Sequence, residues 1–61
     1  MTHDTVIRIL KKAGFTFKEG GKHTKVYKDG RRITQVPRGS GDLNKWTLDS
    51  ISDATGIKLK N

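Results

Sequence analysis

His23-Thr24-Lys25-Val26-Tyr27-Lys28-Asp29-Gly30-Arg31-Arg32-Ile33-Thr34-Gln35-Val36 is the stretch that decides the fold of this 61-residue chain. Two runs of strand-forming residues flank Asp29-Gly30, a dipeptide typical of the tight turn of a β-hairpin. The stretch therefore predicts strands over residues 22–28 and 31–36. Ile33 and Val36 are three positions apart, and a regular strand would point them to opposite faces. We therefore expect a β-bulge near Thr34-Gln35.

Upstream of the hairpin, the sequence predicts a helix followed by another strand. Apolar residues recur with the i, i+3, i+4, i+7 spacing of one helix face, namely Val6, Ile9, Leu10 and Ala13. This spacing indicates a helix over residues 4–13, which Thr2 or Asp4 can cap and Gly14 can end. Alternation over residues 15–19 indicates a strand.

Downstream of the hairpin, apolar spacing around Leu48 and Ile51 indicates a helix over residues 45–55. The predicted order over residues 1–61 is α-β-β-β-α in one α+β domain, a three-stranded antiparallel sheet. Two helices should cover one face of this sheet, because a bare sheet of this size is not stable. We expect His3 to lie in a fraying N-terminal tail and residues 58–61 to form a loose tail.

Composition narrows the class of protein. The chain has no cysteine, which is typical of a reducing cytosol. It has neither the apolar run of a signal peptide nor the roughly 20 apolar residues of a membrane span. We expect a soluble cytoplasmic protein without membrane contact. With 31% hydrophobic residues, so short a chain buries only about 60% of its unfolded surface, which favours a stabilising partner.

Positive charge is concentrated in one half of the chain. The net charge is +7. Residues 8–38 carry +8, from ten Lys or Arg residues against Glu19 and Asp29, and the rest of the chain carries −1. A one-sided positive field attracts phosphate backbones. The sequence therefore favours binding to a nucleic acid or another polyanion, although such charge also serves as a solubilising surface.

A histidine in the second predicted strand is the candidate for chemistry. Strand alternation places Thr24 and Val26 on one face and His23, Lys25 and Tyr27 on the other. Val26 is the better core residue, so His23 should lie on the open face. A cation can bind phosphate there, an aromatic ring can stack on a base, and an imidazole can reach a 2′-hydroxyl.

Histidine suits proton transfer near neutral pH, because its unperturbed pKa lies there. A base that removes the 2′-hydroxyl proton of RNA lets that oxygen attack the adjacent phosphorus. This chemistry requires neither a metal nor another cofactor. The two histidines and the scattered carboxylates show no metal-ligand spacing, and no serine lies in a nucleophile elbow.

Several short motifs, in this order and at this spacing, resemble the HicA-type toxins of bacterial and archaeal toxin–antitoxin pairs. The motifs are Leu10-Lys11-Lys12-Ala13-Gly14-Phe15, Gly21-Lys22-His23, Asp29-Gly30-Arg31-Arg32-Ile33-Thr34, Val36-Pro37-Arg38, and Asp42-Leu43-Asn44-Lys45 with Thr47-Leu48 and Ser50-Ile51. The resemblance covers nearly the whole chain. It implies a fold like that of double-stranded-RNA-binding domains and an endoribonuclease that acts on messenger RNA. It gives His23 the essential role by position, and it implies a hetero-oligomer with a HicB-type antitoxin that blocks the active face.

The chain departs from the family pattern at four positions. Lys22 stands where the family often has serine, and Gly39 stands where it often has a second histidine. Gln35 resembles an insertion in the third strand. Trp46 replaces a common small residue, and it is either a partly buried core aromatic or an anchor that faces a partner.

The leading interpretation is a metal-independent ribonuclease toxin. In it, His23 is the general base, or both acid and base, on single-stranded mRNA. Lys22 and Lys25 bind phosphate, Arg38 joins them across the sheet, and Tyr27 offers a stacking surface. For each cation, a solvated surface charge is an equally good interpretation.

Two other classes of function stay open. The first is a non-catalytic RNA-binding module with the shape of a double-stranded-RNA-binding domain. Such modules carry a lysine cluster at the start of the last helix, whereas this helix has Lys45 together with Asp49 and Asp53. The second is an interaction protein whose inactive site is neutralised by an acidic partner.

Overall fold

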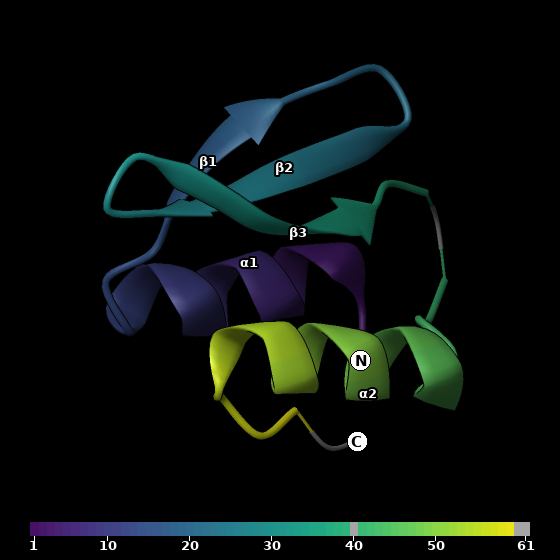
Figure 1. Cartoon of the computed structure of the whole chain (residues 1–61). Helices are drawn as coiled ribbons and strands as arrows, with labels where there is room; N and C mark the ends of the chain where they lie inside the picture. Colours follow the sequence, from purple (N-terminus) through teal and green to yellow (C-terminus); the bar gives the residue numbers. More distant parts are fainter. Residues whose placement is uncertain (40, 60–61) are drawn as a thin grey trace.

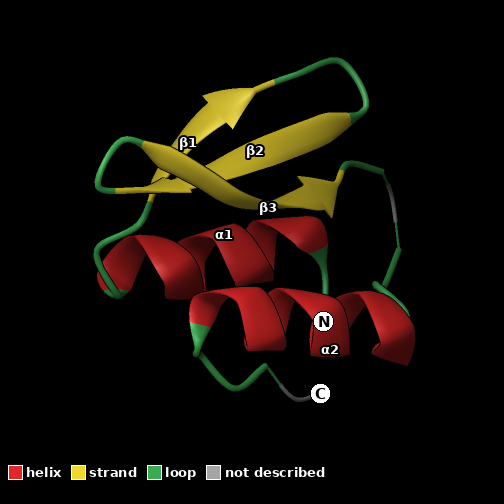
Figure 2. Cartoon of the chain, in the orientation of Figure 1, coloured by secondary structure: helices red, strands yellow, loops and turns green. Residues whose placement is uncertain are grey.

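The computed structural model describes residues 1–39 and 41–59. The chain folds into two layers, a sheet and a pair of helices (Figure 1). The elements follow the predicted order α-β-β-β-α, each end within one residue of its expected place: α1 (His3–Lys12), β1 (Thr16–Glu19), β2 (His23–Lys28), β3 (Arg31–Pro37) and α2 (Lys45–Thr55). The strands form an antiparallel sheet in the order β1-β2-β3. Both helices lie against the same face of this sheet (Figures 1 and 2). The predicted fold class is therefore confirmed.

Helix α1 begins at the cap that its sequence offers. Of the two candidates, Thr2 is the N-cap, and its hydroxyl oxygen accepts a hydrogen bond from the backbone N–H of Thr5 at 3.3 Å. This contact satisfies one of the free N–H groups of the first turn. Gly14 follows the helix with φ +95°, a conformation that favours glycine. Ala13 is exposed, so the buried stripe of the helix ends at Leu10.

The β-bulge lies one position earlier than the sequence predicts. Val26 pairs with Thr34 and Tyr27 pairs with Arg32, so Ile33 is the extra residue of β3. Gln35 pairs regularly with Lys25 and is not the insertion. The bulge at Ile33 lets this side chain pack against the core without disturbing the buried position of Val36. The expected bulge is therefore present, next to the predicted Thr34-Gln35, and the interpretation of Gln35 as the insertion was wrong.

The core lies between the helices and the inner face of the sheet. It is formed by Val6, Leu10, Phe15, Val26, Val36, Leu48, Ile51 and Leu59. Thr24 is also buried, at 2% exposure, so Thr24 and Val26 face the helices as predicted. The opposite, outer face of the sheet carries the side chains of His23, Lys25 and Tyr27, all of which are half-buried.

Both ends of the described chain are held in place. His3 is the first residue of α1, and its Nε2 lies 2.7 Å from Thr24 Oγ1, because this buried hydroxyl needs a partner. Leu59 is 5% exposed, and its side chain belongs to the core. Its backbone N–H donates to Ser52 Oγ at 3.0 Å. The prediction of a fraying His3 was wrong, and the loose tail predicted for residues 58–61 was wrong at Leu59. Lys60 and Asn61 lie outside the described residues.

Candidate functional site

A close backbone contact fixes the start of β2, where His23 lies. The N–H of Gly20 donates to the carbonyl oxygen of His23 at 2.9 Å, which closes the β1–β2 loop. A Cβ atom at Gly20 would lie 2.8 Å from that same oxygen, whereas one at Gly21 would meet nothing within 4 Å. The loop therefore needs glycine at position 20 to bring the His23 backbone this close.

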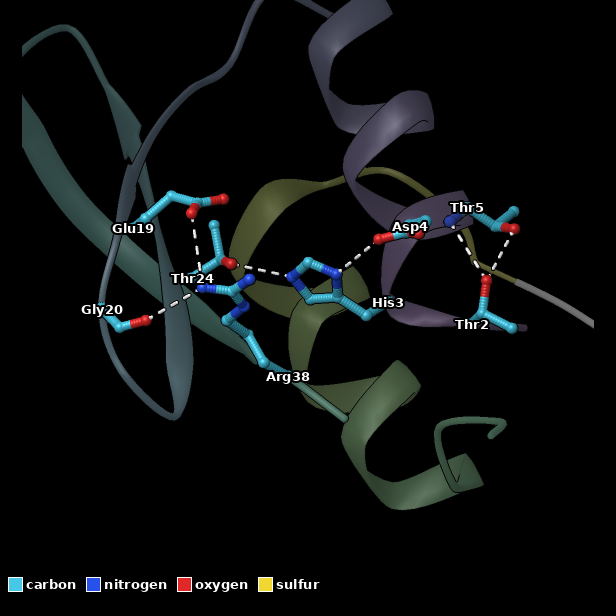
Figure 3. A network of polar contacts seen from close by, with 8 residues as sticks. All are labelled: Thr2, His3, Asp4, Thr5, Glu19, Gly20, Thr24 and Arg38. Carbon is cyan, nitrogen blue, oxygen red and sulfur yellow. Dashed lines mark hydrogen bonds and ion pairs between the residues drawn. The ribbon is translucent and has the colours of Figure 1, made fainter. Parts of the chain in front are cut away.

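The same loop is held from the end of β3 by Arg38. Its Nη1 donates to Glu19 Oε2 and to the carbonyl oxygen of Gly20, both at 3.3 Å (Figure 3). Its backbone N–H donates to the carbonyl oxygen of Lys22 at 2.9 Å. The guanidinium of Arg38 is therefore engaged with the loop, and Glu19 already supplies it with an anion.

The outer face of the sheet is strongly cationic. The strand register places Lys18 opposite Lys25 and Arg32 opposite Tyr27, so cations from all three strands share the face of His23. No Asp or Glu of the described strands shares it, because Glu19 pairs with Thr24 on the other face. Like charges directly opposite each other destabilise a sheet. This arrangement is typical of a surface that binds an anion.

The predicted site residues are only partly brought together. At about 3.3 Å per residue, Lys25 lies about 7 Å from His23 along β2, and Tyr27 lies about 13 Å away. Lys22 is exposed in the loop that leads into His23. His23, Lys22 and Lys25 thus form one neighbourhood, Tyr27 lies at the far end of the strand, and Arg38 contacts the loop.

A pocket of about 320 Å³ connects His23 with α2. Its lining residues come from β2, β3 and α2, namely His23, Thr34, Gln35, Pro37, Trp46, Thr47, Ser50 and Ile51. The cross-strand partner of His23 is Pro37, the last residue of the edge strand β3. A second hollow along this edge is lined by Arg32, Ile33, Thr34 and Gln35, and it shares two residues with the pocket. The two hollows follow the edge of β3.

Sequence reasoning missed most of the residues around this pocket. Trp46 is 84% exposed, which excludes a place in the core, and it borders the same pocket as His23. On the outer face of the sheet, Lys18 and Arg32 were counted only as part of the overall charge. Their place on the face that carries His23 depends on the register and on the bulge. The hairpin turn and the spacing of Ile33 and Val36 gave the only signals for these two features.

The imidazole of His23 is free for chemistry. Within residues 1–39 and 41–59 it has no hydrogen-bond partner, and it is half-buried beside Pro37. Over the same residues, no three His, Cys, Asp or Glu side chains are grouped as metal ligands. No helix in this part of the chain is long and apolar enough to cross a membrane.

The fold and the site define a small basic α-β-β-β-α protein with a histidine on a cationic sheet face, unpaired among the described residues. The family model described as "HicA toxin of bacterial toxin-antitoxin" matches residues 4–57 of the 61. The chain therefore belongs to the HicA toxin family of toxin–antitoxin systems, as its motifs indicate. No curated protein and no solved structure matches it.

Proposed function

We propose that this chain is the toxin of a type II toxin–antitoxin pair and a metal-independent endoribonuclease that cleaves mRNA through His23. The observation that carries the proposal is the imidazole of His23, which has no partner among residues 1–39 and 41–59 and lies on a sheet face where the described strands place cations and no carboxylates. Membership of the HicA toxin family supports the same reaction class.

The proposed reaction uses the nucleophile that RNA itself carries. His23 removes the proton of a 2′-hydroxyl, and the 2′-oxygen forms a bond to the adjacent phosphorus. The bond from phosphorus to the 5′-oxygen breaks, and this oxygen receives a proton from the imidazolium or from water. The products are a 2′,3′-cyclic phosphate and a 5′-hydroxyl.

Cations near His23 have a defined role in this reaction. Negative charge builds on the phosphate oxygens in the transition state, and fixed positive charges stabilise it. Lys25 shares the face of His23, and Lys22 precedes it in the loop. We assign these two lysines to the phosphate beside the cleaved bond and Tyr27, farther along β2, to a base.

The proposed inhibitor is a HicB-type antitoxin that covers the outer face of the sheet. A complementary, acidic partner surface would neutralise Lys18, Lys25 and Arg32 and close access to His23. The complex would be a cytoplasmic hetero-oligomer. Co-expression with a HicB-type antitoxin, followed by co-purification and an RNA-cleavage assay, tests this part of the proposal.

A comparison of two histidine variants tests the cleavage. Wild type, His23→Ala and His3→Ala are expressed, and growth arrest and cleavage of single-stranded RNA are measured with EDTA present. Loss of the general base should slow cleavage by about 10²- to 10⁴-fold. His3→Ala is the matched control, because His3 lies on the helix side of the sheet and contacts Thr24.

The outcomes separate the classes of function. Equal cleavage by wild type and His23→Ala would contradict the assignment of His23. Binding of RNA without cleavage by either protein would favour the non-catalytic RNA-binding module. A single 2′-deoxy substitution at the cleaved position should block wild-type cleavage, because the internal nucleophile is then absent.

A further inference from the structure

The indole of Trp46 is the one large hydrophobic side chain that is exposed in the described part of the chain, at 84%. It is the second residue of α2, directly after Lys45. It contributes little to the core, because so little of its surface is buried. An exposed indole beside a pocket offers a flat surface on which a base can stack.

The lining of the pocket beside Trp46 has the chemistry to bind a flat ring. Trp46 borders it from α2 and Pro37 borders it from β3, so apolar groups stand on two sides. Between them lie side-chain hydroxyl and amide groups, which can hydrogen-bond to the edge of a base: Thr34, Gln35, Thr47 and Ser50. Its volume of about 320 Å³ lies at the lower end of the roughly 300–1,000 Å³ of small-ligand pockets. One nucleobase is an occupant of suitable size.

The charges near the pocket favour an anionic ligand. Neither Asp49 nor Asp53 of α2 lines either hollow along β3, and Arg32 lines the second one. The cationic outer face carries Lys25 and Lys18 together with His23. Aromatic rings next to a positively charged track are how proteins hold single-stranded nucleic acids.

A protein anchor would present a different geometry. An anchoring tryptophan fills a pocket on the partner molecule. Trp46 instead borders a hollow of its own chain, which it shares with the proposed catalytic histidine. The surroundings of the indole therefore favour a ligand that enters the hollow.

We propose that Trp46 stacks on the base of a nucleotide next to the phosphodiester whose cleavage His23 catalyses. The pocket between β3 and α2 is then a base-binding subsite for single-stranded RNA. The position of the phosphodiester in this inference rests on the proposed function, whereas the stacking itself does not require cleavage.

Fluorescence gives a direct test, because Trp46 is the only tryptophan of the chain. A mixed-sequence single-stranded RNA is titrated into His23→Ala protein, and a ribose-phosphate oligomer of equal length without bases serves as the charge-matched control. We expect quenching of the indole emission by the RNA and little quenching by the control. Trp46→Ala should bind the RNA roughly 5- to 100-fold more weakly with an unchanged salt dependence. Trp46→Phe, which keeps a ring, should recover much of this loss.

The results distinguish this inference from the proposed function. Quenching with weakened binding by Trp46→Ala supports the stacking even if wild type cleaves no RNA, in which case only the cleavage fails. Binding and cleavage by Trp46→Ala at the wild-type level would overturn the stacking and leave the proposed function standing. Normal RNA binding together with lost antitoxin binding would also overturn it, because the indole would then be a protein anchor. Circular dichroism of each variant checks the fold.

Discussion

The imidazole of His3 joins the start of α1 to the centre of the sheet through Thr24, with 2.7 Å between Nε2 and Oγ1 (Figure 3). Its other nitrogen, Nδ1, lies 3.0 Å from Asp4 Oδ1. When Nδ1–H donates to this carboxylate, Nε2 accepts from the Thr24 hydroxyl. His3 is only 13% exposed, so this contact is part of the packed structure.

We expect His3→Ala to lower the free energy of unfolding by about 1–3 kcal/mol, because it leaves the buried Thr24 hydroxyl without a partner. Urea denaturation of His3→Ala, Thr24→Val and the double variant measures the coupling between the two residues. The double variant should lose less stability than the two single variants lose together, because neither residue is then left without its partner. Losses that add within about 0.3–0.5 kcal/mol would contradict the contact. The folded His3→Ala protein should still cleave RNA.

The neighbouring glycines of the β1–β2 loop should respond differently to the same change. Gly20→Ala places a Cβ 2.8 Å from the backbone oxygen of His23, which no side-chain rotation relieves. We expect it to cost about 1–3 kcal/mol of stability and to slow cleavage, because His23 must move. Gly21→Ala meets nothing within 4 Å and should change stability by no more than about 1 kcal/mol. Equal effects of the two variants in thermal melts and cleavage assays would refute this steric account.

The fold was largely predictable, because its signals are local. Asp29-Gly30, the apolar stripe of α1 and the alternation of β2 each act within a few residues, and the elements they predict are present. The predictions failed where contacts join distant parts of the chain. His3 is held by a residue 21 positions away, and Leu59 by one seven positions away.

The site was less predictable for the same reason. Alternation alone assigned His23, Lys25 and Tyr27 to one face, since it needs no partner strand. The placement of Lys18 beside Lys25 depends on strand register, and that of Arg32 depends on the bulge at Ile33. Trp46 reaches the His23 pocket only through the packing of α2 against β3, which no local pattern reports.

The pair Lys18 and Lys25 predicts a trade between stability and RNA binding. Lys25→Gln removes one of two like charges that face each other, so stability at low salt should rise by about a few tenths of a kcal/mol. The same variant, in the His23→Ala background, should reduce the slope of log K against log salt for single-stranded RNA by about 0.7. Lys12→Gln, at an exposed position of α1, is the matched control and should leave the salt slope of RNA binding unchanged. The same loss of slope in both variants would show that only net charge matters.

Arg38 offers a test between holding the loop and binding phosphate. Its guanidinium donates to Glu19 and to the Gly20 carbonyl, and this loop leads into His23. If it holds the loop, Arg38→Ala should slow cleavage with little change in the salt slope of RNA binding. Its exposed ion pair itself should contribute only about 0–1 kcal/mol of stability.

A second variant, Glu19→Gln, separates the two roles of Arg38, because it removes the carboxylate that competes with phosphate for the guanidinium. If Arg38 holds the loop, Glu19→Gln should slow cleavage, as Arg38→Ala does. If Arg38 binds phosphate, as the sequence predicts, Glu19→Gln should strengthen RNA binding. Stronger binding by Glu19→Gln, with a salt slope reduced by about 0.7 in Arg38→Ala, would therefore assign Arg38 to the RNA backbone.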